Sequence, residues 1–383
     1  MTAADIVVIG GGMAGASAAY EIAARNRVVL LEREKFCGYH STGRSAASFT
    51  ENYGNSVIRR LAKASRTFFE RPPPGFSEAT LVAPRGILTI GRTDQLEALA
   101  RAFERGRAFV PDLVEIDPAA AIARAPILHR DYVAGAFFEP RSRDIDVHAV
   151  HQGFLKGLKV RGGSIVTDAE VSAIDRHRNL WRIETRSGRF EAAVVIDAAG
   201  AWAEEVASMV GARPIGLVPK RRTAFSIDAP PGVDPSPWPL VDDVSAEFYF
   251  KPDAGRLLVS PADATPSPPT DAQPEEIDVA IGLDRLQRAT ALSVHRVTHK
   301  WAGLRSFVAD GSPVVGWDDE VEGFFWLAAQ GGYGIKTAPA LARAAARLIA
   351  RDGVPRDLLD HGLDQSVLGP SRCRLTGAAL TEN

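Results

Sequence analysis

Three glycines near the N-terminus, Gly10, Gly12 and Gly15, separate an apolar run from an alanine-rich segment. At this spacing Gly10 allows a tight turn, Gly12 lets a pyrophosphate approach the backbone, and Gly15 lets a helix pack closely on a strand. The free amides at the start of that helix attract an anion. Glu32 ends the next apolar run, where a carboxylate binds a ribose 2′-hydroxyl and repels a 2′-phosphate. Together these residues predict a dinucleotide site rather than a glycine turn without a ligand.

Three later segments have the composition of loops that contact the flavin dinucleotide FAD. Residues 37–47 (CGYHSTGRSAA) follow the second apolar run, residues 198–202 (AAGAW) end a later one, and residues 331–334 (GGYG) precede an alanine-rich helix. The N-terminus of that helix could stabilise negative charge on a reduced flavin, so the segments favour FAD over NAD. With the three glycines and Glu32, the candidate cofactor-binding residues are Ala14, Arg33, Ser41, Thr42, Gly43, Arg44, Ser45, Ala46, Ala47, Ser48, Val171, Gly200, Gly331, Gly332, Tyr333, Gly334, Ile335 and Lys336.

The segments around these motifs predict the elements that must position them. Residues 5–10, 13–24 and 27–32 have the pattern of a strand, a helix and a strand, which is one βαβ unit. Asp117 followed by Pro118 is typical of a helix start. Further helices are expected at 56–70, 94–105, 147–160, 276–292 and 338–350, and strands at 80–91 (one hairpin or two strands), 164–174, 181–187 and 190–197, in several runs between 217 and 260, and again after 300.

Composition excludes several classes of protein. The chain has 383 residues, enough for two or three domains. Its formal net charge of -2 gives it no overall attraction for nucleic acid. Cys37 and Cys373 lie at opposite ends and cannot form a Cys-based zinc or iron–sulfur site. His148 and His151 have helical spacing but no third ligand, so we expect them on a helix surface and expect no metal.

The N-terminal residues and the apolar runs bear on location. No apolar run reaches the roughly 18 residues of a membrane span, and Asp5 directly precedes the first apolar run without a basic segment before it. We therefore expect no transmembrane segment and no signal peptide. Two distant cysteines suit a reducing compartment, and we expect a cytoplasmic protein.

Six stretches, spread over almost the whole chain, resemble sequences of a known enzyme superfamily. The chain resembles the D-amino acid oxidase/dehydrogenase superfamily of FAD enzymes, which includes glycine and sarcosine oxidases. Within it, the similarity is greatest to the bacterial D-arginine dehydrogenases. The matching stretches are the glycine motif at 10–15, GYHSTGRSAA (38–47), PKRR (219–222), FYFKPDAG (248–255), WAGLRSFVADG (301–311) and AAQGGYGI (328–335).

The resemblance implies an α/β fold in which a Rossmann-like FAD-binding domain is interleaved with an α+β substrate domain that has an antiparallel sheet over the flavin. Some relatives attach the flavin covalently through a histidine near the position of His40, but the residues around His40 differ from their pattern, and we expect noncovalent FAD. The expected ranges are 1–50, 145–215 and 305–360 for the FAD-binding domain, 51–144 and 216–304 for the substrate domain, and 361–383 for a C-terminal tail.

The resemblance also assigns candidate substrate-binding residues. Arg305 and Arg222 match positions that hold the substrate carboxylate, a role that suits the planar guanidinium fork. Tyr53 and Tyr249 match positions that line the pocket with an apolar wall and a hydroxyl. Arg221 is expected to be structural. The remaining substrate-pocket candidates are Ser48, Ile87 and Gly332.

The chemistry implied by the resemblance is hydride transfer from an amine-bearing carbon to the flavin. We therefore expect oxidation of a D-amino acid to an imine, which water converts to a 2-oxo acid, with oxygen or a quinone as the unidentified electron acceptor. No side chain stands out as a general base. An N-methyl or opine-type secondary amine remains an alternative substrate, and the chain could instead be the flavin subunit of a hetero-oligomeric dehydrogenase.

Three residues depart from the D-arginine dehydrogenase pattern. Ile87 stands where that group has an acid facing the guanidinium of its substrate, Ser48 where it has a histidine, and Lys336 where it has a glutamine. We expect Lys336 either to add positive charge near the flavin or to be a solvated lysine. We also expect neutral or apolar D-amino acids to be preferred over D-arginine, unless a replacement acid reaches the pocket. The candidates for that acid are Glu51, Asp242 and Asp243.

Overall fold

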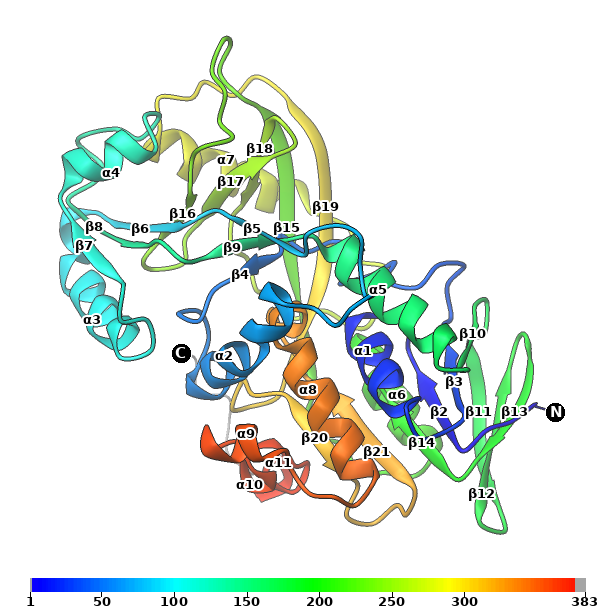
Figure 1. Ribbon diagram of the computed structural model, residues 1–383. Helices are drawn as coiled ribbons and strands as arrows, with labels where there is room; N and C mark the ends of the chain where they lie inside the picture. The colour runs from blue at the N-terminus through cyan, green and yellow to red at the C-terminus, as the bar shows by residue number, and fades with distance from the viewer. Residues whose placement is uncertain (1, 376–383) are drawn as a thin grey trace.

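A six-stranded sheet carries the glycine motif in the computed structural model, which describes residues 2–375 (Figure 1). Its strands are parallel except for the edge strand β20. Their apolar side chains are buried on both faces. The strand order is β10 (Ser164–Val166), β3 (Val28–Leu31), β2 (Ile6–Ile9), β14 (Val194–Asp197), β21 (Phe324–Ala328) and β20 (Val314–Trp317).

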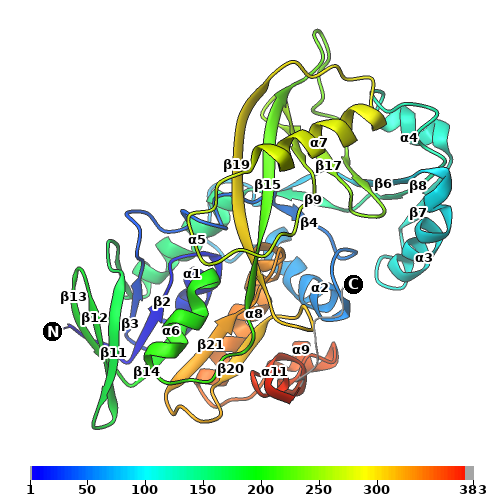
Figure 2. The ribbon, with the colours of Figure 1, turned by 180° about the vertical axis from the view of Figure 1, so that it is seen from behind.

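Both faces of this sheet are covered. Helices α1 (Met13–Ile22), α5 (Val147–Val160) and α8 (Gly334–Ile349) pack against one another on one face, and the small side chains of α1 allow α8 to approach closely. Figure 2 shows the other face, where α6 (Ala203–Met209) and a second sheet lie. That sheet has the order β1 (Thr2–Ala3), β13 (Gly188–Ala192), β12 (Leu180–Thr185), β11 (Val171–His177).

An eight-stranded sheet forms the second body. Neighbouring strands are antiparallel except for the parallel pair β16–β6. Helices α7 (Glu276–Ala289) and α4 (Pro118–Arg124) bury apolar side chains on the face that points away from the first body (Figure 2). The strand order is β19 (Val297–Phe307), β15 (Val218–Asp228), β18 (Arg256–Ser260), β17 (Tyr249–Asp253), β16 (Leu240–Asp243), β6 (Ile87–Gly91), β8 (Gly135–Glu139) and β7 (Val114–Ile116).

The remaining elements connect or flank the two bodies. Helix α2 (Ser56–Glu70) begins after Asn55, whose side chain caps it, and packs on α8. A three-stranded sheet is formed by β4 (Ser48–Phe49), β9 (Arg143–Ile145) and β5 (Val82–Pro84). The other short elements are η1 (Thr93–Gln95), α3 (Leu96–Arg107), η2 (Gly200–Trp202), α9 (Arg356–Asp360), α10 (Gln365–Leu368) and α11 (Ser371–Leu375).

The expected α/β fold with an interleaved, largely antiparallel second sheet is confirmed, but two strand expectations are wrong. Residues 164–174 form two strands in different sheets, because Asp168 adopts a positive φ of 52° and breaks the run. Residues 190–197 are divided between β13 and β14, which belong to different sheets. Residues 80–91 form the second of the two expected arrangements, two strands, and β5 and β6 lie in different sheets.

The C-terminal part differs in detail from the expectation. Helix α8 begins at Gly334, directly after the glycine loop, rather than at residue 338. Residues 376–383 of the expected tail lie outside the described residues. Among the helices within residues 2–375, none combines the length and the apolar composition that a bilayer crossing requires.

Candidate active site

A cavity of about 540 Å³ lies between the six-stranded and the eight-stranded sheets. Its lining comes from both bodies, and it runs from Glu32 and Val171, beside β3 and β11, to Tyr249 and Asp242 on the second sheet. All the candidate cofactor and substrate residues line this cavity except Gly15 and Gly43. The structure therefore brings together segments that are far apart in the sequence.

The glycine turn has the shape that a dinucleotide needs. Gly10 adopts a positive φ of 109°, and a Cβ atom at Gly15 would lie 1.9 Å from the Gly10 carbonyl oxygen. Gly12 is different, because the protein atom nearest to a Cβ added there would be the Thr42 hydroxyl oxygen at 3.4 Å, which leaves the backbone open to the cavity. Gly15 is therefore a packing residue and does not line the cavity.

Glu32 is held beside this turn. Its two carboxylate oxygens accept hydrogen bonds from the backbone amides of Gly11 and Glu34, each at 2.9 Å. Burial raises the pKa of the carboxyl group, and these two amides partly offset that effect. The glycine turn, the acid and the start of α1 thus fit a dinucleotide with a free ribose hydroxyl.

His151 corrects the expectation of a surface histidine. Its side chain is buried, and Nε2 donates to the Gly11 carbonyl oxygen at 2.9 Å. Burial lowers the pKa of the ring, which keeps it neutral and able to brace the glycine turn. The signal was present in the sequence, because position 151 falls in the apolar stripe of α5 together with Val150, Phe154, Leu155 and Leu158.

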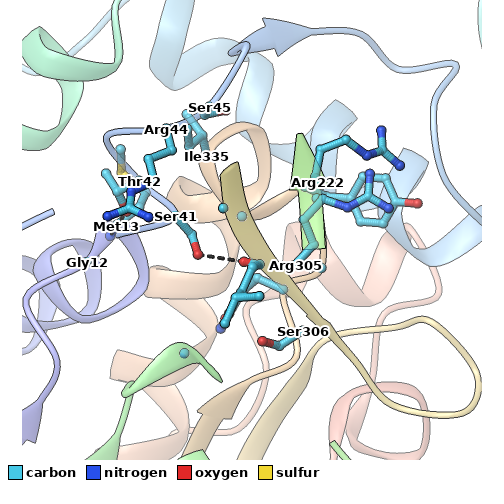
Figure 3. Close-up of a pocket in the computed structure, with 18 of the residues that line it drawn as sticks. Gly12, Met13, Ser41, Thr42, Arg44, Ser45, Arg222, Arg305, Ser306 and Ile335 are labelled. Carbon is cyan, nitrogen blue, oxygen red and sulfur yellow. Dashed lines mark hydrogen bonds between the residues drawn. The ribbon is translucent and has the colours of Figure 1, made fainter. Parts of the chain in front are cut away.

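The segment after β3 ties the glycine turn to the second body (Figure 3). The Thr42 hydroxyl accepts from the Met13 amide at 3.0 Å, and the Ser41 hydroxyl donates to the Leu304 carbonyl on β19 at 2.6 Å. Trp301 Nε1 donates to the Arg44 carbonyl at 3.0 Å. The cofactor loop is therefore bonded directly to the strand that carries Arg305.

Two residues of this segment act differently from the expectation. The Arg44 guanidinium donates to the carbonyls of Ala272 and Ala302, both at 2.9 Å, and pairs with Asp271, so its charge is already used within the protein. Gly43 does not line the cavity, because its amide closes a turn onto the Gly38 carbonyl at 2.8 Å.

The cavity-facing side of the second sheet follows from strand register. Residues paired across neighbouring strands share a face, as do alternate residues along one strand. Lys220 pairs with Arg305, so Arg222, two residues further on, lies on the same face as Arg305. Tyr249 pairs with Asp242, and Asp242 with Thr89. This face also contributes Ile87, Phe137, Glu139, Ala224, Leu240 and Gly303 to the lining.

The two arginines converge on the cavity with donors to spare (Figure 3). Arg222 Nε donates to the Asp263 carbonyl at 2.6 Å, while its terminal nitrogens have no protein acceptor within hydrogen-bonding distance in the described chain. Arg305 Nη1 lies 3.5 Å from the Tyr53 hydroxyl, and Arg305 Nε is buried without a partner among residues 2–375. A carboxylate can receive the unused donors of both side chains.

The pKa of Tyr53 reflects the positive potential that Arg222 and Arg305 create in the cavity. Burial would raise the pKa of its hydroxyl, but the charges of Arg305 and Arg222 outweigh that effect and lower the pKa. Its ring contacts that of Tyr333, with ring centres 5.1 Å apart. By contrast, Arg221 points to the other face and pairs with Glu275 and Asp278, in keeping with a structural role.

Acidic side chains reach the cavity at the other end of the sheet. Asp242 and Asp243 line it, whereas Glu51 does not and instead bonds Arg66 Nε at 2.5 Å. Ser48 and Ile87 both line the cavity, and Ile87 pairs with Glu139, which sequence reasoning missed. The expectation from the sequence is that substrates with neutral side chains are preferred unless another acid takes the place of the one missing at position 87. Asp242 lines the cavity, so the condition for that preference is not met.

Lys336 is neither a solvated lysine nor free to point at a ligand. Its side chain is 3% exposed, and Nζ donates to the carbonyls of Thr50 and Tyr53 at 2.9 and 2.7 Å. Burial lowers the pKa of the amine to about 7. Lys336 therefore fixes the loop that presents Tyr53 to the cavity.

This burial makes a pH-dependent difference in stability. Between pH 7 and an unfolded pKa of about 10.4 the unfolded chain holds a proton that native Lys336 has lost, so the free energy of unfolding rises with pH. In Lys336→Gln this contribution is absent. We therefore expect the stability of the wild type relative to the variant to increase from pH 7 to pH 9. Denaturant titrations of both FAD-loaded proteins measure it, and parallel pH curves would contradict the burial of a titrating amine.

The other candidates complete the site. The His40 ring nitrogen Nε2 lies 3.0 Å from Glu34 Oε1, and the ring packs on Trp202 with centres 4.7 Å apart. Within residues 2–375 there is no group of three or more His, Cys, Asp or Glu side chains that could hold a metal ion.

Known proteins resemble the chain over nearly its full length. Glycine oxidase from Geobacillus kaustophilus (strain HTA426) is 23% identical, with 95% of this chain and 97% of that protein covered. Sarcosine oxidase subunit beta from Rhizobium meliloti (strain 1021) is 26% identical, with 92% and 85% covered. The crystal structure of L-proline dehydrogenase from P. horikoshii has the same fold, with a TM-score of 0.84, 21% identity and 98% of both chains covered.

The family assignment follows from a match across the segments that meet in the cavity. A family model described as FAD dependent oxidoreductase matches residues 5–348, from the strand before the glycine turn to the end of α8. That range contains every residue assigned above to the cavity lining. The chain belongs to the family of FAD dependent oxidoreductases.

Proposed function

We propose that this FAD-dependent enzyme oxidises the C–N bond of an amino acid whose nitrogen carries a second carbon substituent. A hydride leaves the α-carbon and a proton leaves the nitrogen, which forms a C=N bond. Water then adds to that bond and releases a 2-oxo acid and a primary amine. When bound, FAD supplies the flavin ring that accepts the hydride.

The observation that carries this proposal is the pair of arginines with unused donors. Arg222 and Arg305 extend from adjacent strands on the cavity face of the sheet. They can bind and orient a carboxylate next to the Tyr53 hydroxyl. Their positive charge also favours the neutral form of a nearby amine, which is the form that can lose a hydride without a general base.

The nature of the nitrogen substituent is the finer part of the proposal. Two of the relatives described above are named for sarcosine and L-proline, whose nitrogens each carry two carbons. The lining of the cavity also includes Arg59 on α2 and Ala102 and Arg105 on α3, and this part of the cavity would provide space for a substituent. A primary D-amino acid is the second candidate, in keeping with the resemblance inferred from the sequence of residues 248–255 and 301–311.

Anaerobic reduction of the flavin in the purified single chain tests this proposal. The panel contains N-methyl and N-carboxyalkyl amino acids with their unsubstituted D- and L-counterparts. We expect an N-substituted acid to reduce the flavin at least about tenfold faster than its primary amine, because the substituent fills the part of the cavity lined by Arg59, Ala102 and Arg105. Faster reduction by primary D-amino acids would favour the second candidate, and no reduction by any amine would contradict both. Subsequent admission of oxygen or a quinone identifies the electron acceptor.

A further inference from the structure

Asp242 lies on the cavity face of β16, on the same sheet face as the two arginines. Three strand spacings separate β16 from β15 in the order β15, β18, β17, β16. At about 4.8 Å each, the backbones of β15 and β16 are therefore roughly 14 Å apart across the sheet, and Arg222 lies two residues along β15 from the row of Asp242. The cavity face of the eight-stranded sheet thus has a cationic end at the two arginines and an acidic end at Asp242.

The Asp242 carboxylate lacks a partner that could neutralise it. Its Oδ1 atom has no hydrogen-bond partner in the described chain, although the side chain is partly exposed to the cavity. Arg92 pairs with Asp243 and Lys251 with Asp144, and within residues 2–375 no cation pairs with Asp242. Its neighbour Asp243 is in a different situation. Asp243 Oδ1 accepts from Gln95 Nε2 at 3.1 Å and from the Ser245 amide at 2.8 Å. Its Oδ2 also has no hydrogen-bond partner, but it lies 3.8 Å from Arg92 Nη1. The fold therefore supplies a cation to Asp243.

The side chains that face Asp242 do not supply the missing charge. Thr89 on β6 gives it a hydrogen bond, Tyr249 on β17 is its cross-strand neighbour, and Glu139 on β8 is a second acid. The amine of Lys336 is used by the carbonyls of Thr50 and Tyr53. Burial raises the pKa of Asp242 to about 7, and the charges of Asp243 and Glu139 act in the same direction. A charged carboxylate in this partly buried position is costly unless protonation or a cationic ligand compensates for it, and the cavity beside it is open to such a ligand.

We propose that Asp242 binds a cationic group, an ammonium or a guanidinium, at the far end of the substrate, while Arg222 and Arg305 hold the carboxylate. The proposal rests on the proposed function for the place of the carboxylate. It identifies the substrate class as amino acids with a basic side chain or a basic nitrogen substituent. The side chains of Arg222 and Arg305 extend from the sheet into the cavity and shorten the distance to Asp242. An extended molecule of this kind can therefore contact the arginines at one end and Asp242 at the other.

The position of Ile87 agrees with this assignment. Ile87 and Thr89 are alternate residues of β6, and they pair with Leu240 and Asp242 on the parallel strand β16. Ile87 and Asp242 are therefore diagonal neighbours on one face. An acid on β16 can serve the part of the cavity that an acid at position 87 would serve.

Two non-oxidisable probes test the assignment on the FAD-loaded protein. The first, δ-guanidinovalerate, and the second, δ-ureidovalerate, share a carboxylate and a chain length and differ in the charge of the far end. Neither has an α-amine, so the result does not depend on which amine the enzyme oxidises. Binding is followed by the change in the visible absorbance of the flavin, and the ratio of the two dissociation constants is the readout.

We expect the wild type to bind the guanidino probe at least about tenfold more tightly than the ureido probe. In Asp242→Asn the ratio should fall to about one while the ureido affinity is kept. Asp243→Asn is the matched control, since its amide oxygen can still accept from Gln95, and it should keep the wild-type ratio. Adding Ile87→Glu to Asp242→Asn should restore a preference for the guanidino probe.

Several outcomes would overturn the assignment. They are a wild-type ratio near one, an unchanged ratio in Asp242→Asn, or a wild type that binds neither probe. FAD content and circular dichroism establish that each variant is folded. These outcomes can be distinguished from a failure of the proposed function. In that case N-substituted amino acids would not reduce the flavin, but the ratio of the two dissociation constants and its dependence on Asp242 would persist.

Discussion

Replacing Arg305 by methionine is expected to weaken substrate capture by roughly 2–5 kcal/mol, which corresponds to a loss of about thirtyfold to several thousandfold in kcat/KM. The size reflects the removal of one partner from a charge pair inside the cavity. Methionine keeps a side-chain stem near Gly332, whose added Cβ would lie only 3.1 Å from Arg305 Cδ. The packing beside the glycine loop is therefore largely preserved, and FAD should remain bound.

Stopped-flow reduction of the flavin over a range of substrate concentrations measures this loss. Arg221→Met is the matched control, because Arg221 is next to Arg222 in sequence but points to the opposite face and pairs with Glu275 and Asp278. The control should keep the wild-type apparent affinity. An unchanged affinity in Arg305→Met would move the carboxylate site to another part of the cavity.

The substitutions Gly15→Ala and Gly12→Ala are both expected to weaken FAD binding, but for different physical reasons. At Gly15 the new Cβ would lie 1.9 Å from the carbonyl oxygen of Gly10, a backbone atom that must shift. We expect this variant to lose about 1–3 kcal/mol or more of stability even without FAD. At Gly12 the nearest protein atom is 3.4 Å away, so the apoprotein should keep its stability and lose FAD affinity by about tenfold or more.

Thermal unfolding of the apoproteins and FAD titration separate these two effects. Gly15→Ala should lower both the melting temperature and FAD binding. Gly12→Ala should lower FAD binding alone. If Gly12→Ala bound FAD as the wild type does, the pyrophosphate would not approach the backbone at that turn.

The parts of the fold that could be predicted from the sequence are those with local information. The βαβ unit of β2, α1 and β3 follows from apolar runs around Gly10 and Gly15, and the Asp117 cap marks the start of α4. The division of residues 190–197 between β13 and β14 has no local signal. No glycine or proline interrupts that run, and the change of sheet depends on pairing with distant strands.

The residues of the candidate site likewise fall into those that the sequence predicts and those that it does not. The arginines and the glycine loops could be found from motifs, because their roles require particular residue types at particular spacings. The position of Asp242 could not, since only its pairing with Tyr249 and Thr89 shows that it faces the cavity. The burial of Lys336 could not be predicted for a related reason, because it is caused by the loop at Thr50 and Tyr53, far away in the sequence.

The position of β21 in the six-stranded sheet imposes an order of events on synthesis. The chain leaves the ribosome from its N-terminus, so β2, β3 and β14 emerge long before residues 324–349. During that interval β14 is an unpaired sheet edge, and the cavity lacks the wall formed by residues 331–336. An open edge invites pairing with other chains. Between the synthesis of residues 197 and 324 the nascent protein therefore has an aggregation-prone edge and no complete place to retain its cofactor.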